Sequence, residues 1–322
     1  MSEPTVPLTV LLGSSATAKA DLLGRLADDD PGHLAVVCSG HDDVPAGALV
    51  VRGAERVAEQ SLGCSCCALR LDVRRAVFRL LARRRPPGRI VIVAGAEADP
   101  GPLLATLLCD VHMVRRTNLH AVVAALDGPE AAVRLATGQP LALGVRAEEH
   151  IAVADGIVVL GTSRLTPVAR AQLAGALRRL NPFEPWWADD DQPVPAPPAT
   201  PQGTPYALGG LADRLDGICA APSESSHSVF LDIEGEAEAE ALRAWAQDLC
   251  QRQGARLLRL QAVCSLRGRT ERWACSAVRS FYATSWCAPS PAGPARARVL
   301  AVGSDLDVDA LAGSLRLALA RA

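Results

Sequence analysis

The chain has 322 residues, of which 49% are hydrophobic, enough to fill the core of one large or two ordinary domains. Its 33 basic and 35 acidic residues give a net charge of −2 without a long block of one sign, which argues against a nucleic-acid-binding protein. No apolar run reaches the roughly 18 to 20 residues that cross a bilayer, and the N-terminus lacks the charged region of a signal peptide. We therefore expect a cytoplasmic protein with neither nucleic acid nor membrane as a partner.

Short apolar, β-branched runs recur along the first half of the chain and predict strands. The runs cover residues 8–12, 34–38, 90–94, 121–126 and 156–160. Helical patterns lie between them at residues 19–26, 68–83 and 167–180. Strands that alternate with helices form parallel βαβ units. We predict a doubly wound, mainly parallel α/β domain over residues 1–188.

The composition changes after this domain. Residues 189–205, DDDQPVPAPPATPQGTP, are dense in proline, and residues 206–226 show no clear pattern, so we predict a linker over residues 189–226. Beyond it, strands outnumber helices. HSVFLDIEG, ARLLRLQAVCSL, TERWACSAVRSFYATSW and RARVLAVG are typical of strands, while residues 236–254 and 308–320 are typical of amphipathic helices. This pattern predicts a smaller α+β domain over residues 227–322.

The first predicted strand leads into a segment with the outline of a phosphate-binding loop. In G-x-x-x-x-G-K-[ST], backbone N–H groups and the lysine bind phosphate, and the hydroxyl binds Mg²⁺. Gly13 and Lys19, the only lysine in the chain, match this pattern, but Ala18 and Ala20 replace the second glycine and the hydroxyl. The residues leave open a nucleotide site, the remnant of one, or a plain strand and helix. We assign Gly13 and Lys19 as a weak phosphate site.

Three of the ten cysteines lie within four positions just before a predicted helix: Cys64, Cys66 and Cys67. Thiolates bind zinc strongly, and the N-terminus of a helix lowers thiol pKa values. Three thiols leave one position of a tetrahedral site open, which suits a site that acquires and passes on metal. The cluster therefore predicts a metal site, with redox chemistry as the alternative.

A fourth ligand for this site is predicted from the loop after the second strand, where the candidates are Cys38, His41 and Asp42. The other histidines, His150 among them, are interpreted as surface or capping residues. The cysteines outside the cluster lie mostly in apolar surroundings and are interpreted as buried free thiols.

These stretches together resemble the CobW family of metal-handling GTPases over most of the chain. GAERVAEQSLGCSCCALRLD, with its G-C-x-C-C pattern, is similar to the family's most distinctive segment. EADPGPLLATL, EEHIAVADGIVVL, LNPFEPWW and RARVLAVGSDLDVDAL are similar to further family segments. The resemblance implies a P-loop NTPase-like sheet and a GTPase that delivers zinc, cobalt or a related metal to a client protein, with Cys64, Cys66 and Cys67 as the metal site.

The nucleotide motifs depart from those of the family. Val93 and Ala96 stand where the family has Glu and Gly ahead of Ala-Asp-Pro, and Arg164 replaces the Asp that reads guanine. Alanine methyls obstruct the approach of phosphate, and the hydroxyl that would contact Mg²⁺ is missing. An arginine in place of a carboxylate also removes a charge-assisted hydrogen bond to the base. We expect binding of GTP and Mg²⁺ to be impaired or lost.

Three functions follow from these observations. The leading hypothesis is a zinc- or cobalt-handling protein that works without nucleotide, with a client metalloprotein or an intact CobW-like relative as its partner. The second is an active GTPase with a divergent phosphate loop. The third is a pseudoenzyme scaffold whose cysteines have no metal-binding role.

Overall fold

The computed structural model describes residues 5–29, 34–39, 55–59, 65–144, 146–189, 211–216, 218, 228–287, 289 and 293–320, without the side chains of residues 28, 29, 39, 55–59, 65–72, 109, 214, 255 and 281. The chain forms two units, Met1–Arg178 with Phe183–Pro197, and Arg179–Pro182 with Pro198–Ala322. The boundaries expected from the sequence, at residues 188 and 226, stay a prediction. None of the helices described is long and apolar enough to span a bilayer.

The first unit is built on a seven-stranded sheet in which every neighbouring pair of strands is parallel. In spatial order the strands are β3 (Glu55–Glu59), β2 (Leu34–Ser39), β4 (Arg89–Val93), β1 (Val6–Leu12), β5 (Thr117–Asp127), β6 (Gly156–Leu160) and β7 (Trp186–Ala188). This order confirms the doubly wound α/β fold that the alternating pattern predicts.

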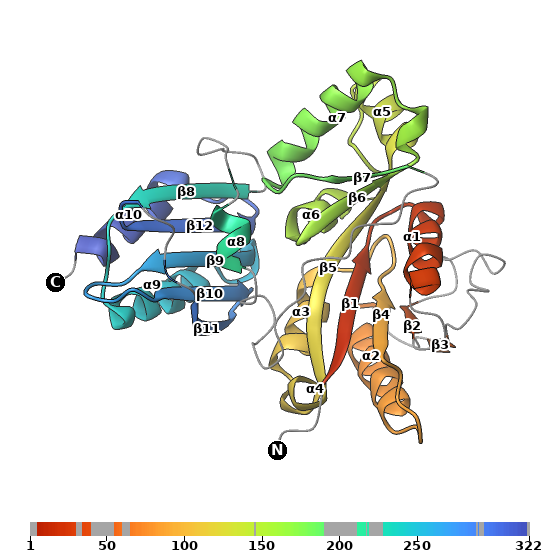
Figure 1. The fold of residues 1–322 in the computed structure, drawn as a ribbon, viewed down its shortest axis with the longest axis horizontal. Coiled ribbons are helices and arrows are strands. Elements are labelled where there is room, and N and C mark those ends of the chain that lie inside the picture. The colour runs from red at the N-terminus through yellow and green to blue at the C-terminus, as the bar shows by residue number, and fades with distance from the viewer. Residues whose placement is uncertain are drawn as a thin grey trace. The chain divides into compact units, whose positions relative to one another are not determined.

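Helices cover both faces of this sheet (Figure 1). They are α1 (Ala16–Asp29), α2 (Ser65–Leu81), α3 (Pro100–Cys109), α4 (Val111–Arg116), α5 (Gly128–Ala136), α6 (Ala147–Val153) and α7 (Pro167–Leu180), with a short 3₁₀ turn, η1 (Thr162–Arg164). The connection from β1 through α1 to β2 runs toward the β3 edge of the sheet, whereas the connections through α3 and α6 run toward the β7 edge. Right-handed crossovers therefore place α1 on one face of the sheet and α3 and α6 on the other.

The core of this unit follows from the strand sequences. Val91 and Val93 of β4 pack in one cluster with Leu22, Leu23 and Leu26 of α1. The alternate residues of the same strand, Ile90 and Ile92, are equally buried, with no exposed surface. Because strand residues alternate between faces, burial of both sets requires cover on both sides, which is why these strands read as continuous apolar runs.

The second unit is a five-stranded antiparallel sheet in the order β11 (Phe281–Cys287), β10 (Arg272–Val278), β9 (Leu257–Ser265), β12 (Arg296–Gly303) and β8 (Ser228–Glu234). Two helices, α9 (Ala239–Gln253) and α10 (Val308–Ala320), pack on one face, with a 3₁₀ turn, η2 (Gly254–Arg256), after α9. These elements confirm the α+β fold expected for this part of the chain. A further helix, α8 (Leu211–Asp216), lies within the segment that we expected to be a linker, and it contacts β9 and β12.

The apolar core of the second unit contains three cysteines, Cys250 of α9, Cys264 of β9 and Cys275 of β10. All three are free thiols and buried. Burial raises the pKa of Cys250 to about 11 and raises the pKa values of Cys264 and Cys275 as well. These thiols are therefore uncharged core residues, as the apolar surroundings of the scattered cysteines suggest.

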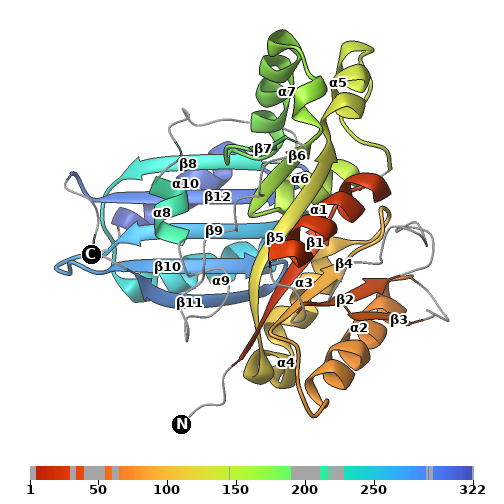
Figure 2. The ribbon, with the colours of Figure 1, turned by 45° about the vertical axis from the view of Figure 1, so that its right-hand side comes forward.

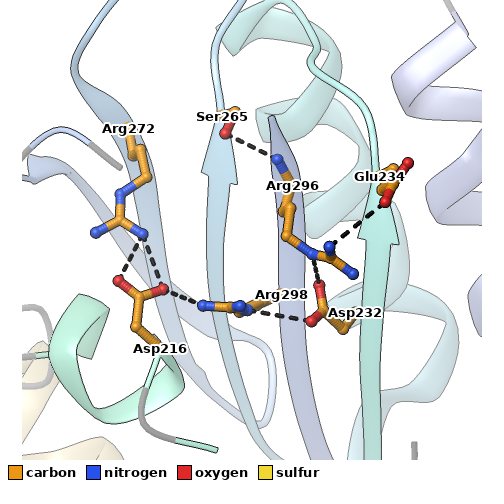
Figure 3. A network of polar contacts seen from close by, with 7 residues as sticks. All are labelled: Asp216, Asp232, Glu234, Ser265, Arg272, Arg296 and Arg298. Carbon is orange, nitrogen blue, oxygen red and sulfur yellow. Dashed lines mark hydrogen bonds and ion pairs between the residues drawn. The ribbon is translucent and has the colours of Figure 1, made fainter. Parts of the chain in front are cut away.

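The opposite side of this sheet carries a network of arginines and carboxylates (Figure 3). Asp216 of α8 accepts two hydrogen bonds from Nη1 of Arg272, at 3.0 and 2.9 Å, and a further one from Arg298. Arg298 also donates to Asp232 at 3.3 Å, and Arg296 donates to the same carboxylate at 2.6 Å. The strand register places Arg298 directly opposite Asp232, so the sequence of the strands sets this pairing. The network fixes α8 to the sheet.

Candidate functional site

The candidate phosphate loop begins at Gly13, immediately after β1. Gly13 has a φ of +128°, and a Cβ at this position would collide with the carbonyl oxygen of Ala125 on β5. Only glycine combines this φ with such a close backbone approach. The glycine that the sequence singled out is therefore required by the packing of β1 against β5, independently of any ligand.

The loop is short because α1 begins at Ala16, ahead of the start expected at Lys19. Ser15 caps the helix: its Oγ accepts a hydrogen bond from the N–H of Ala18 at 3.2 Å, and its carbonyl oxygen accepts one from the N–H of Lys19 at 3.1 Å. Backbone N–H groups that a phosphate loop offers to its ligand are thus engaged within the chain here. Ala18 and Ala20 are buried in the core cluster of α1.

The lysine of the candidate site lies inside the protein. Lys19 has no exposed surface, and its Nζ donates a hydrogen bond of 2.8 Å to the carbonyl oxygen of Ala94, just after β4. The N–H of Ala94 in turn donates to the carbonyl oxygen of Leu11 on β1. Lys19 therefore connects α1 to the end of β4 through a charged donor and a backbone acceptor.

His150 of α6 is a second buried polar residue of this region, and our interpretation of it as a surface or capping residue is wrong. It has no exposed surface, its Nδ1 accepts a hydrogen bond from the N–H of Gly13 at 3.3 Å, and its Nε2 lies 2.7 Å from the carbonyl oxygen of Ala98. An N–H can only donate and a carbonyl can only accept, so the proton resides on Nε2. Burial lowers the pKa of His150 below its ordinary value, with a smaller contribution in the same direction from Lys19. His150 is thus a neutral side chain that joins the loop after β1 to the loop after β4.

Hydrogen bonds from side chains of α1 and α6 hold the loop after β4 in place. Ala94 and Ala98 accept the hydrogen bonds from Lys19 and His150. Asp99 caps α3 by accepting a hydrogen bond of 2.9 Å from the N–H of Gly101, and it lies 3.6 Å from Arg146. The Asp of the Ala-Asp-Pro stretch therefore has a structural role in this chain, as the N-cap of a helix.

The segment after β6 stands where the resemblance implies a guanine-reading motif. Gly161 adopts a left-handed φ of +67°, and the guanidinium of the exposed Arg164 lies directly against it, because a Cβ on Gly161 would be 2.5 Å from Nη2. Thr162 donates a hydrogen bond to the carboxylate of Asp189. The segment thus presents a cation, and positions 161–164 contain no carboxylate of the kind that the family's motif supplies.

The predicted metal ligands fall largely outside the described residues. Cys64 lies outside them, and Cys66 and Cys67 belong to the first turn of α2, without a description of their side chains. Of the three candidates for a fourth ligand, Cys38 is buried at the end of β2, whereas His41 and Asp42 lie outside the described residues. The described side chains include no group of three or more His, Cys, Asp or Glu residues that could hold a metal ion. The metal site at Cys64, Cys66 and Cys67 stays a prediction.

The sequence marks Lys19 more clearly than it marks His150. Lys19 stands out because it is the only lysine of the chain. His150 carries one weak signal, its place beside the apolar residues of IAVA in EEHIAVAD. Its partner Gly13 is 137 residues away, so no local pattern could connect the two.

The sequence matches two family models, one for each part of the chain. Residues 7–187 match the family described as CobW/HypB/UreG, nucleotide-binding domain, and residues 226–319 match the cobalamin synthesis protein cobW C-terminal domain. Among solved structures, the Zn(II)-bound YjiA GTPase from E. coli aligns with a TM-score of 0.72 at 16% identity, covering 98% of this chain and 99% of that one. A Zn(II)-bound triple mutant of YjiA aligns with the same TM-score at 17% identity and the same coverage. At this identity the structures show a shared fold, while the two family matches span most of the sequence: the chain belongs to the CobW family.

Proposed function

We propose that this chain is a zinc- or cobalt-handling protein of the CobW family that binds metal through Cys64, Cys66 and Cys67 and in which GTP binding is impaired or lost. The metal is the cargo, passed to a client metalloprotein directly or together with an intact CobW-like relative. The observation that carries the nucleotide part of the proposal is the position of Lys19, which is buried and bonded to Ala94.

The residues around Lys19 fit a nucleotide poorly. To contact a phosphate, the Nζ of Lys19 would have to leave the Ala94 carbonyl and expose a group that is now fully buried. The N–H groups of Ala18 and Lys19 are already bonded to Ser15. Ala20 offers no hydroxyl to Mg²⁺, so one metal contact and part of the charge neutralisation that phosphoryl transfer needs are missing.

The metal part of the proposal rests on the cysteine spacing and on the backbone of α2. Because α2 begins at Ser65, Cys66 and Cys67 occupy its first turn, where the helix dipole favours the thiolate form that binds metal. A protein of the same fold, YjiA, has been solved with Zn(II) both in its parent form and as a triple mutant in which two cysteines are replaced by alanine. This likeness supports zinc binding, and the choice of ligands rests on the cysteine spacing alone. Three thiolates without a closed fourth position suit a site that exchanges metal with a partner.

The test combines metal analysis with a nucleotide titration. Purified protein should carry or take up close to one equivalent of Zn²⁺ or Co²⁺ by elemental analysis, and the Cys64→Ser/Cys66→Ser/Cys67→Ser variant should lose it. Cys287→Ser, which alters a half-buried thiol of the second unit, is the matched control and should retain the metal. Unchanged metal affinity in the triple variant would refute the metal part.

The same preparation is titrated with a fluorescent GTP analogue in the presence of Mg²⁺. We expect no saturable binding at micromolar nucleotide and no turnover above background. The active-GTPase alternative predicts turnover that disappears in Lys19→Ala, and this result would overturn the nucleotide part. Absence of both metal and nucleotide binding would favour the scaffold.

A further inference from the structure

Two helices of the first unit, α2 and α4, are connected by polar contacts, and both lie at the end of the sheet where β5 begins (Figure 2). Near the middle of α2, the Nε of Arg74 lies 3.0 Å from a carboxylate oxygen of Asp110, the residue that caps the start of α4. At the other end, Arg116 of α4 donates a hydrogen bond of 3.4 Å to the carbonyl oxygen of Leu81. These two contacts connect the middle and the end of α2 to the start and the end of α4.

The surface of α2 contains an open hollow of about 490 Å³ lined by Arg74, Arg75, Phe78, Arg79 and Ala82. The guanidinium of Arg74 lies over the ring of Phe78, with 5.7 Å from Cζ to the ring centroid. Phe78 is half-buried, whereas Arg75 and Arg79 are exposed. The hollow therefore combines an aromatic floor with a rim of cations.

Arginines far outnumber carboxylates on α2, on α4 and in the segment that follows α2. Residues 74–85 and 110–116 together contain eight arginines and a single carboxylate, Asp110, in a chain whose net charge is −2. Exposed apolar side chains accompany the charge, because Val111 and Val114 of α4 are 60% and 48% exposed. A positive rim around aromatic and aliphatic groups favours a ligand that is both acidic and apolar.

A helix face that contacts only solvent usually has a more balanced set of charges than α2 has. Such faces usually alternate acidic and basic residues three or four positions apart, so that the charges balance along the helix. Residues 74–85, RRAVFRLLARRR, contain no acidic residue, and Asp72, three positions before Arg75, is the one carboxylate of α2. Within α2, Arg75 and Arg79 lie four positions apart, a spacing at which like charges repel, and an acidic partner would relieve this repulsion.

We propose that α2 and α4 form a docking surface for an acidic, amphipathic segment of a partner protein, which places an apolar side chain over Phe78 and carboxylates on Arg75 and Arg79. Arginine suits this role because its planar guanidinium binds a carboxylate with two parallel hydrogen bonds and also stacks on aromatic rings. Nucleic acid is the competing ligand for a basic surface, but the apolar floor and the near-neutral charge of the whole sequence favour a peptide.

The position of this surface connects it to the predicted metal site. Cys67 and Arg75 are eight residues apart on one helix, a distance of about 12 Å along its axis. A protein docked on the arginines would hold its own metal ligands within reach of the start of α2. Identifying the docked protein as the metal acceptor rests on the proposed function, whereas the docking itself does not.

The test is a selection that presupposes no particular partner. A displayed library of random peptides, each about 16 residues long and so able to span a helix the length of α2, is enriched on the full-length protein. The recovered peptides are measured by fluorescence anisotropy. We expect sequences rich in Asp and Glu that also contain Phe, Leu or Trp. Arg75→Glu/Arg79→Glu should weaken their binding by at least about tenfold, and added salt should weaken it as well.

The matched control is Arg243→Glu/Arg252→Glu, which makes the same change of charge on two arginines of α9 in the second unit, the half-buried Arg243 and the exposed Arg252. This control should leave peptide binding within about twofold of the parent value. The Cys64→Ser/Cys66→Ser/Cys67→Ser variant should also retain peptide binding, so failure of the metal proposal would be distinguishable from failure of this one.

Three results would overturn the proposal. The first is a selection that enriches no peptides or peptides without acidic residues. The second is equal loss of binding in the α2 and α9 variants. The third is tighter binding of a single- or double-stranded oligonucleotide than of any selected peptide, lost in Arg75→Glu/Arg79→Glu, which would assign the surface to nucleic acid.

Discussion

Two arginine-rich regions of this molecule are built in opposite ways. On the sheet of the second unit, Arg272, Arg296 and Arg298 meet the carboxylates of Asp216, Asp232 and Glu234 (Figure 3). Residues 74–85 and 110–116 of the first unit hold eight arginines and one carboxylate. The comparison indicates that arginines matched by nearby carboxylates hold elements together, while exposed arginines in a segment with excess positive charge are suited to bind a partner.

Burial explains why the first set must be matched. The side chain of Arg272 is only 6% exposed and that of Asp216 14% exposed. Removing charges from water costs several kcal/mol per ion, which only a close, well-oriented counter-charge offsets. Arg75 and Arg79 of α2 are exposed, so solvent screens their charges and the cost of burial does not arise. Each of the following changes tests one side of this comparison.

The largest expected effect is that of Asp216→Ala. This change leaves the buried Arg272 without the carboxylate that accepts its two hydrogen bonds, and we expect the free energy of unfolding to fall by about 3 kcal/mol. Urea unfolding followed by tryptophan fluorescence measures the change. Glu234→Ala is the control, because that side chain is 71% exposed and should contribute at most about 0.5 kcal/mol. Equal effects of the two changes would show that burial does not decide the role of these pairs.

Lys19→Ala tests a buried cation whose ammonium group bonds to a backbone carbonyl. The change deletes a fully buried side chain and takes the donor away from the Ala94 carbonyl, so we expect a loss of about 2 kcal/mol in unfolding free energy. Thermal and urea unfolding measure it, with the exposed Asp21→Ala on the same helix as the control. A stability equal to that of the parent protein would contradict the structural role of Lys19.

A smaller effect is expected from the titration of His150 as the pH falls below neutrality. Burial holds the pKa of His150 below its ordinary value of 6.5. The unfolded chain takes up this proton at a higher pH than the folded protein does, so this contribution to stability is present above the ordinary pKa and declines as the pH falls toward the pKa of the folded protein. His150→Gln should flatten the pH dependence of unfolding. An unchanged profile in this variant would remove His150 as its source.

The smallest effect is expected on α2. Arg75→Gln/Arg79→Gln should change the free energy of unfolding by less than about 0.5 kcal/mol, because exposed side chains on a helix surface contribute little to stability. Differential scanning calorimetry measures the shift. A loss comparable to that of Asp216→Ala would show that these arginines support the fold and would weaken the proposed docking surface.

Much of the fold could be predicted from local patterns. The sequence predicts helices over residues 167–180 and 308–320, and α7 and α10 have these bounds, while the segment RARVLAVG coincides with β12. In each case a regular apolar pattern coincides with an element that packs on the core. The expected start of α1 is wrong because Ser15, which caps the helix, lies inside the segment that resembles a phosphate loop.

Several of the elements that the sequence did not reveal are short or lack periodicity. β7 has only three residues, and β3, ERVAE, carries charge at both ends. α8 has only six residues in a region that looks like a linker, and it depends on Asp216 and its partners on β10 and β12. Such elements form because of contacts with distant residues, which no local pattern encodes.

The candidate site could be predicted only in part. Gly13 and Lys19 are recognisable from the spacing of a known loop, yet the spacing does not indicate that Lys19 bonds to Ala94 or that His150 bonds to Gly13. These bonds follow from how β1, β4 and α6 pack together. The assignment of Cys64, Cys66 and Cys67 to metal is still a prediction from sequence.

The buried thiols of the second unit have a practical consequence for anyone handling this protein. Cys250, Cys264 and Cys275 resist alkylation and oxidation while the sheet is closed, because burial raises their pKa values and keeps reagents away. Once the sheet opens, all three become reactive together, so air oxidation would trap the opened chain and make denaturation irreversible. Pulse labelling with iodoacetamide would therefore time each opening event of this unit, and refolding calls for a reductant throughout.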